Sequence, residues 1–389
     1  MAEAFLPYGR QTIEDDDVAA VAAALRDDFL TTGPRVEAFE TAFADFVGAK
    51  HAVACANGTA ALHLAMLALG VQPGEVCIVP SITFLATANC VRYVGAEVVF
   101  ADVDPDTGLM TPETLADAIA RAGGRRIAAV LPVHLRGDIA ELPALRDLAD
   151  GVGAALVEDA PHALGSAMVF DNVPARAGDN RWGAMATFSF HPVKTMTTAE
   201  GGMVTTADPA LADRLRTLRS HGMLRPAGAE PWWYEMPEIG FNYRLPDVLC
   251  ALGLSQLAKL PRFIERRRAL TRRYEAALAP LSPLVQTAAR PPWSDPALHL
   301  MSVLIDFAAV GRSRAEVMEA LRVRGVGSQV HYIPVHRQPY YAQRYGALDL
   351  PGAEAWYART LSLPLYPAMA DGDVDRVVGA LTEALGLAR

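Results

Sequence analysis

Lysine is scarce in this chain of 389 residues. Only Lys50, Lys194 and Lys259 are lysines among the 35 basic residues, and all the others are arginines. Lys194 stands between an apolar segment, AMATFSF, and a loop rich in threonine and glycine, TTAEGG. Arginine supplies a permanent positive charge but does not act as an amine nucleophile. The question is therefore whether Lys194 is needed for its charge or for its amine.

Other absences exclude whole classes of function. The four cysteines have neither CxxC nor Cys/His ligand spacing, so we predict buried thiols and no metal site. No apolar run approaches the roughly 18 residues of a membrane helix, and the N-terminus lacks the features of a signal peptide. We expect a cytoplasmic protein with no membrane partner. The net charge of −9 argues against a nucleic-acid partner, and we interpret the RRR run at 266–268 as the solvated face of a helix.

The length predicts more than one domain, because single domains usually have roughly 100–200 residues. We expect an N-terminal segment over 1–30, a large domain over 31–250 and a small C-terminal α/β domain over 251–389. One or two strands are expected in the small domain, with 300–307 and 327–333 as the candidates, together with helices over 314–324, 352–361 and 371–387.

Seven short apolar runs alternate with helical patterns between residues 50 and 206. The runs are HAVACAN, EVCIVP, EVVFADV, IAAVLPVHL, ALVEDA, AMATFSF and GGMVTT. Continuously apolar strands separated by helices indicate a sheet that is covered on both faces and is mostly parallel. We therefore predict an α/β fold with a seven-stranded, mostly parallel sheet, whose ligands bind beyond the carboxyl ends of the strands.

Two of these strand ends carry polar groups suited to a ligand. Asn57, Gly58 and Thr59 follow the first run and open a helix, whose free N–H groups and positive dipole end suit a phosphate; an ordinary helix cap by Asn57 or Thr59 is the alternative. Asp159 ends the run ALVED, where a carboxylate either meets a cationic ligand or serves as a cap or loop ion pair. His162 follows three residues later.

Lys194 follows the end of the sixth run by four residues. If that strand is parallel to the one that ends at Asp159, both side chains emerge at one edge of the sheet. Apolar surroundings lower the pKa of a lysine and make its amine a usable nucleophile and base. A phosphate cradle, a carboxylate, a lysine and a flat aromatic, for which Phe84 is the candidate, form the set that pyridoxal 5′-phosphate (PLP) requires.

At this point the sequence resembles the DegT/DnrJ/EryC1/StrS family of nucleotide-sugar aminotransferases, within the fold-type I PLP-dependent transferases. The matching motifs follow one another along nearly the whole chain. They are LTTGP (30–34), NGTAAL (57–62), TFLATAN (83–89), EDAPHALGS (158–166), FSFHPVKTMTTAEGG (188–202), SHGM (220–223), GFNYRLPDVLCALGLSQL (240–257) and QVHYIPV (329–335).

The resemblance implies a role for each matching position. Lys194 would hold the aldehyde of the cofactor, Asp159 would pair with its pyridine nitrogen, and Phe84 would stack on its ring. His162 would lie beside the ring oxygen. The phosphate would be held by Gly58, Thr59 and Ser189, helped by Asn242 of a neighbouring subunit, since family dimers build each site from two chains. Substrate contacts are implied for Tyr8, Thr31, Thr32, Gly33, Arg225, Gln329, His331 and Tyr332.

Two departures from the family pattern are Asn57, where many members have serine, and His162, where many have glutamine. Both keep a hydrogen-bonding side chain. Some relatives have histidine in place of the lysine and are sugar dehydratases, so Lys194 favours transamination. The resemblance implies L-glutamate as amino donor and a nucleotide keto-sugar as acceptor. Within the family, the sequence is similar to the transaminases of pseudaminic acid synthesis in the motifs FSFHPVK, TTAEGG, SHGM and QVHY. Those enzymes act on a UDP-linked 4-keto-6-deoxy N-acetylhexosamine. The alternatives are an aminotransferase that acts on a GDP- or TDP-linked keto-sugar and a regulator that binds PLP without catalysis.

Overall fold

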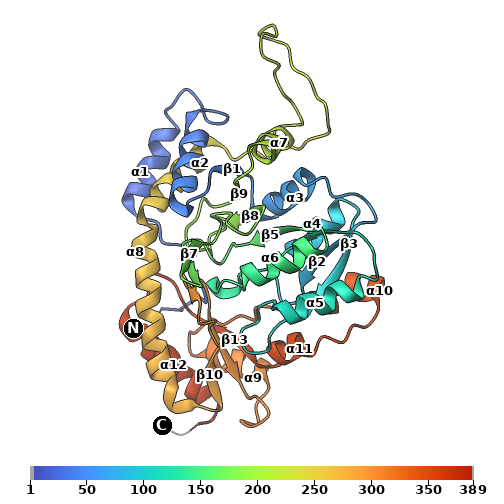
Figure 1. The fold of residues 1–389 in the computed structure, drawn as a ribbon. Helices are drawn as coiled ribbons and strands as arrows, with labels where there is room; N and C mark the ends of the chain where they lie inside the picture. Colours follow the sequence, from blue (N-terminus) through green and yellow to red (C-terminus); the bar gives the residue numbers. More distant parts are fainter. Residues whose placement is uncertain (1–3, 388–389) are drawn as a thin grey trace.

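The large sheet of the computed structural model, which describes residues 4–387, contains the seven strands expected from the apolar runs. Its order is β1-β9-β8-β5-β4-β2-β3, and only β9 runs antiparallel to its neighbours. The predicted α/β fold with a mostly parallel sheet is therefore confirmed (Figure 1). The strands are β1 (His51–Cys55), β2 (Val76–Pro80), β3 (Glu97–Ala101), β4 (Ile127–Val130), β5 (Ala155–Asp159), β8 (Met185–Ser189) and β9 (Gly202–Thr206).

Helices cover both faces of this sheet. One apolar core joins the sheet to α2 (Pro34–Val47), α5 (Pro112–Arg121), α6 (Leu142–Gly151) and the first half of α8 (Asp247–Leu278). A second core on the opposite face holds α3 (Gly58–Ala68), α4 (Leu85–Tyr93) and α7 (Pro209–Arg219). Because both faces are covered, the strands are apolar throughout instead of alternating, which is why they could be found in the sequence.

The C-terminal part has its own core around a three-stranded antiparallel sheet, β10 (Val285–Thr287), β12 (Met301–Ile305) and β13 (Thr360–Leu363). The strand expected within 300–307 is confirmed as β12. The one expected within 327–333 is wrong, since that stretch forms only a single bridge between Gln329 and Ser362. The helices here are α9 (Arg314–Val323), α10 (Pro339–Tyr345), α11 (Pro351–Arg359) and α12 (Asp371–Ala384).

The remaining elements are small. A second three-stranded sheet consists of β11 (Ser294–Asp295), β6 (Ala167–Phe170) and β7 (Val173–Arg176), and α1 (Asp15–Ala24) packs on α8. The division into domains stays a prediction; α8 is one continuous helix across the expected boundary at 250/251. No helix within residues 4–387 combines the length and the apolar character needed to cross a bilayer.

The arginine run in α8 is not a solvated face. Arg266 and Arg268 are partly exposed, but Arg267 has a relative exposure of 1%. Its guanidinium donates to the carbonyl oxygens of His299 at 3.2 Å and Leu365 at 2.8 Å. The interpretation of 266–268 as wholly solvated is therefore wrong, because the helix turns its middle arginine towards the C-terminal core.

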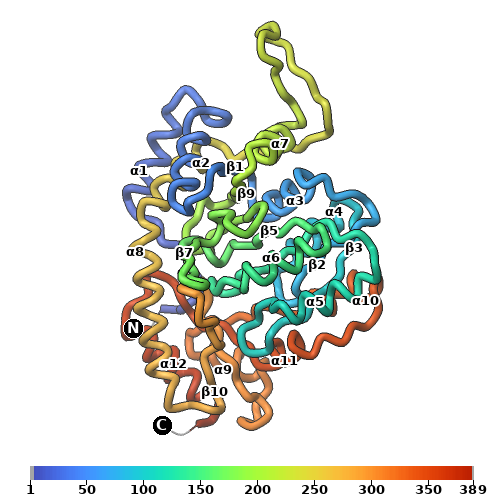
Figure 2. The backbone as a smooth tube through the Cα atoms, viewed as in Figure 1, coloured from blue at the N-terminus to red at the C-terminus, as the bar shows by residue number. Residues whose placement is uncertain are grey.

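An arm formed by residues 220–240 projects from the molecule between α7 and α8 (Figures 1 and 2). Its two limbs are joined by an antiparallel bridge between Leu224 and Glu235. The arm carries large apolar side chains in solvent, with Trp232 72% exposed and Ile239 79% exposed. A surface of this kind on a folded chain marks an interaction site.

Asp247 connects α8 with α2, two helices that pack on the same face of the large sheet. It lies at the start of α8, is fully buried, and accepts hydrogen bonds from the N–H groups of Gly33 at 2.8 Å and Arg35 at 2.9 Å, at the start of α2. We expect Asp247→Ala to lower the free energy of unfolding by about 2 kcal/mol or more, because both N–H groups lose their acceptor.

Chemical denaturation measures this loss, and Asp208→Ala is the matched control. Asp208 caps α7 through the N–H of Ala210 at 2.8 Å but lies at the surface, where water replaces it. Equal losses in the two variants would contradict the role assigned to Asp247.

Candidate active site

A cavity of about 700 Å³ opens at the carboxyl ends of the parallel strands. The turns after β1, β2, β5 and β8 all reach it, as the parallel arrangement requires. Most of the side chains that the sequence suggested line its wall. These are Tyr8, Gly58, Thr59, Phe84, Asp159, His162, Ser189, Lys194, Gln329, His331 and Tyr332.

The phosphate end of the cavity is formed by the turn between β1 and α3. Asn57 is the N-cap of α3, and its side chain accepts a hydrogen bond from the N–H of Ala60 at 2.8 Å. A Cβ atom on Gly58 would lie 2.8 Å from the Cβ of Ser189, so only glycine lets the helix start so close to β8. Asn57 can therefore cap α3 while the same turn binds a phosphate, because the capped helix N-terminus still faces the cavity.

Asp159 is the buried carboxylate of the site, with a relative exposure of 4%. Burial raises its pKa, and three effects oppose this: the hydroxyl of Thr87 donates to its Oδ2 at 2.5 Å, and both Lys194 and His134 lie nearby. Thr83 contacts Thr87 through their hydroxyl oxygens at 2.7 Å. The sequence reasoning missed Thr87, although the motif TFLATAN contains it in the first turn of α4.

Lys194 reaches the same edge of the sheet as Asp159. Strand β5 pairs in parallel with β8, Asp159 opposite Thr187, which confirms the arrangement expected from the sequence. The side chain keeps some exposed surface inside the cavity, yet it is deep enough that burial lowers the pKa of its amine to about 8. Asp159 opposes this shift, since its charge favours the ammonium form. The amine is thus neutral to a useful extent near physiological pH.

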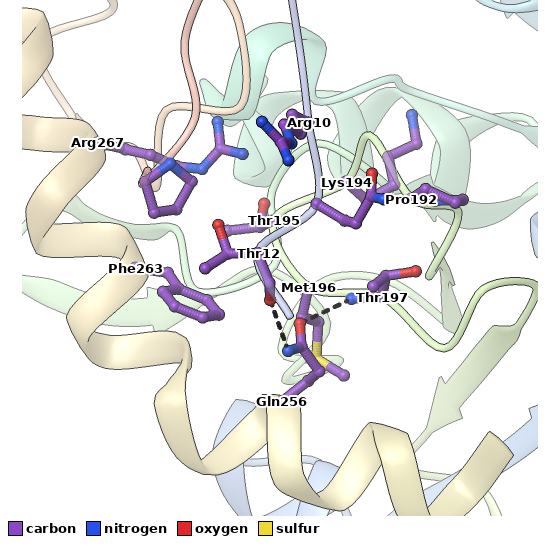
Figure 3. A pocket seen from close by; sticks show the side chains of 12 residues that line it. Arg10, Thr12, Pro192, Lys194, Thr195, Met196, Thr197, Gln256, Phe263 and Arg267 are labelled. Carbon is purple, nitrogen blue, oxygen red and sulfur yellow. Dashed lines mark hydrogen bonds between the residues drawn. The ribbon is translucent and has the colours of Figure 1, made fainter. Parts of the chain in front are cut away.

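The loop that carries Lys194 is held in place by a hydrogen bond to α8. Gln256 of α8 is buried; its amide donates to the carbonyl oxygen of Thr12 at 2.9 Å and accepts from the N–H of Thr197 at 3.4 Å (Figure 3). The hydroxyl of Thr197 in turn donates to the carbonyl oxygen of Phe190 at 2.8 Å. These contacts fix the backbone on both sides of the lysine.

Neutral histidines form the wall opposite the cradle. His162 Nδ1 accepts from the N–H of Arg136 at 3.3 Å, which leaves its Nε2–H to donate to the hydroxyl of Tyr332 at 3.3 Å. His299, which the sequence reasoning did not single out, packs on His162 with ring centroids 4.4 Å apart. Burial lowers the pKa of all three histidines here, that of His331 to about 3. They therefore act as neutral hydrogen-bonding groups.

Phe84 lies at the mouth of the cavity, 57% exposed and 6.2 Å from the ring of Tyr332. Its exposed face is available to stack on a flat ligand. The cavity thus offers a phosphate cradle, a buried carboxylate, an aromatic surface and a lysine with a lowered pKa, and this donor set fits PLP.

Five predicted residues do not line the cavity of their own chain. Thr31, Thr32, Arg225 and Asn242 are exposed, and Gly33 is tied to Asp247 at the start of α2. Within a single chain, Arg225 and Gly33 therefore lie outside the cavity. The roles of these five residues stay predictions.

The sheet, the strand-end cavity and its residues define a fold-type I PLP-dependent enzyme. The sequence matches the DegT/DnrJ/EryC1/StrS aminotransferase family over residues 11–382, and the chain belongs to this family of PLP-dependent sugar aminotransferases. The recognition of the family from its motifs is thereby confirmed.

Solved structures agree over nearly the full length. Helicobacter pylori PseC, an aminotransferase of pseudaminic acid biosynthesis, is 28% identical with a TM-score of 0.86, covering 98% of this chain and 99% of its own. DesI, solved in the presence of its TDP-sugar product, is 35% identical with a TM-score of 0.87, covering 98% and 93%. The PLP form of the sugar aminotransferase Spr1654 from Streptococcus pneumoniae is 26% identical with a TM-score of 0.86, covering 98% and 99%.

Replacing Thr87 tests how Asp159 keeps its charge. Thr87→Val removes a donor that stabilises the carboxylate, so the pKa of Asp159 rises further. As the pH falls, the variant protonates Asp159 at a higher pH than the wild type and releases PLP earlier. Cofactor absorbance after gel filtration at each pH measures this. Thr83→Val is the control, since it removes a neighbouring hydroxyl that contacts Thr87 but keeps the Thr87 donor to Asp159.

The three lysines allow a direct test of Lys194. Borohydride reduction of the loaded protein, followed by peptide mass mapping, is expected to place the cofactor on Lys194. In the cofactor-free full chain, amine labelling of Lys194 is expected to reach half its maximal rate near pH 8, against about 10.4 for an ordinary lysine. The exposed Lys50 serves as the reference for reagent consumption. A cofactor adduct on Lys50 or Lys259, or on none, would contradict the assignment.

Proposed function

We propose that this aminotransferase moves an amino group from L-glutamate to C4 of a UDP-linked 4-keto-6-deoxy N-acetylhexosamine, for pseudaminic acid or a related surface glycan. The observation that carries the transamination is the lysine with a pKa of about 8 beside a buried carboxylate at the phosphate-binding edge of the sheet. The choice of sugar rests on the motifs FSFHPVK, TTAEGG, SHGM and QVHY and on the similarity to PseC.

Each residue of the site has a defined task in this proposal. Bound PLP supplies an electron sink for the carbon that carries the amino group. The carboxylate of Asp159 would hold the pyridine nitrogen of PLP in its protonated form, and its burial would keep water from that contact. The amine of Lys194 accepts the proton from Cα of the amino donor and later delivers a proton to C4 of the sugar. The first transfer needs the neutral amine and the second needs the ammonium form, and a pKa of about 8 makes both forms accessible near neutral pH.

The acceptor sugar would occupy the wide part of the cavity. Tyr8, Gln329, His331 and Tyr332 line the cavity and present hydrogen-bonding groups. Because His331 is neutral, with its Nδ1 engaged by the hydroxyl of Ser362 at 2.8 Å, only its Nε2 is left to contact the sugar. Neutral polar groups of this kind suit sugar hydroxyls and amides.

A homodimer with shared active sites is part of the proposal. Lys194 is the one lysine or arginine among the described residues that line the cavity. A cofactor phosphate and a nucleotide pyrophosphate need further positive or N–H groups. The arm of residues 220–240 carries Arg225 with exposed aromatic residues, and Asn242 follows it, so a partner's arm could supply what one chain lacks. We also propose a cytoplasmic location, where nucleotide sugars are made.

A second candidate is transamination of another nucleotide keto-sugar, of the GDP- or TDP-linked kind. It is supported by DesI, which binds a TDP-sugar product and is 35% identical to this chain. A regulator that binds PLP without turnover is the rival of another class. The accessible Lys194 amine and the wide cavity favour catalysis.

Two assays separate these functions. L-glutamate is expected to abolish the absorbance of the bound aldehyde form of PLP in the wild type and not in Lys194→Ala; an unchanged wild-type spectrum would indicate a regulator. The glutamate-treated enzyme is then mixed with UDP-, GDP- and TDP-linked keto-sugars, and the aminated products are identified by mass spectrometry and NMR. Amination of the UDP-linked sugar at C4 is the expected result, and preference for a GDP- or TDP-linked sugar would overturn the proposed substrate.

A further inference from the structure

A second, much smaller cavity lies behind the lysine loop. It measures about 10 Å³ and lies between the N-terminal segment, the loop that carries Lys194 and helix α8 (Figure 3). Its lining includes three basic residues, Arg10, Lys194 and Arg267, and no aspartate or glutamate. The space accommodates about one water-sized species.

Arg267 is a buried cation without a counterion. It is 1% exposed, and no carboxylate among the described residues forms an ion pair with it. Carbonyl oxygens accept from its NH1, but its Nε has no hydrogen-bond partner among residues 4–387. A buried charge normally needs an opposite charge nearby, because desolvation of an ion is costly.

Two further unpaired donors line the same cavity. The hydroxyl oxygens of Thr12 and Thr195 are buried and have no partner within the described part of the chain. Figure 3 shows the guanidinium groups of Arg10 and Arg267 at one end of the cavity and the two hydroxyls beneath them. Arg10 likewise has no ion pair within the described chain. Every unsatisfied group around the cavity can therefore donate a hydrogen bond.

We propose that this cavity is an anion site, which binds one small monovalent anion such as chloride between Arg267, Thr12 and Thr195. The anion compensates the charge of Arg267 and accepts the hydrogen bonds that the protein leaves unmade. The volume excludes phosphate, sulfate and organic carboxylates. Because Thr195 directly follows Lys194, the bound anion also fixes the backbone of the lysine loop from the side opposite the PLP cavity.

The halide dependence of stability tests the site in the loaded, full-length enzyme. At constant ionic strength, the thermal midpoint is expected to rise and saturate as chloride or bromide replaces gluconate, which is too large for the cavity. In crystals soaked in bromide, an anomalous peak is expected within hydrogen-bond distance of Arg267 Nε and of the two threonine hydroxyls.

Thr12→Val removes one donor while the hydrogen bond to its carbonyl oxygen from Gln256 is kept. It should weaken bromide binding about tenfold, since hydrogen bonds to charged groups are strong. Thr271→Val is the matched control. Thr271 also has a buried hydroxyl without a partner in the described part of the chain, and it lies on α8, the helix that carries Arg267, but it does not line the cavity. This variant should respond to bromide as the wild type does.

Three results would overturn the proposal. One is the same stability of the wild type in chloride and in gluconate. Another is an equal bromide response in the wild type and in Thr12→Val, which would place the halide elsewhere. The third is water-like density in the cavity with no anomalous signal.

Discussion

The parallel pairing of β5 with β8 is the constraint on which the active site depends. It sets Asp159 opposite Thr187 and so brings the carboxylate and the following lysine loop to one edge of the sheet. Both groups are buried at this edge, and burial shifts both pKa values towards the neutral forms. Each charge partly offsets the shift of the other. A slip in the register of these strands would separate Asp159 from Lys194 and leave an unpaired buried charge. The strand pairing therefore also positions the two groups for the reaction.

Much of the fold could be predicted from the sequence because covered parallel strands are apolar along their whole length. The seven runs correspond to seven strands for that reason, and Lys194 and Asp159 could be located because each follows such a run. The C-terminal part was harder. Strand β13 begins directly after α11, in TLSL, and its pattern is too short to separate from the end of the helix. Residues 327–333 have a strand-like composition but form only one bridge, since tertiary contacts decide their pairing.

The residues that sequence reasoning missed act through contacts between distant segments. Thr87 matters because its hydroxyl meets Asp159, 72 positions further along the chain, and nothing local in TFLATAN indicates that partner. His299 lies in an irregular stretch and joins the site only because it packs on His162. Arg267 was read as solvated from its charged neighbours, whereas the rotation of α8 decides which of three consecutive arginines faces inward. In each case the missing information is the packing of one element on another.

Helix α8 spans 32 residues, about 48 Å, and packs on α1, α2, α12 and β10. It holds the start of α2 through Asp247, supports the lysine loop through Gln256 and enters the C-terminal core through Arg267. Pro261 stands inside it, between the last two of these contacts, and has no N–H to lose when the helix bends. The helix that joins the large sheet to the C-terminal core therefore has a break in its backbone hydrogen bonding between the lysine loop and that core.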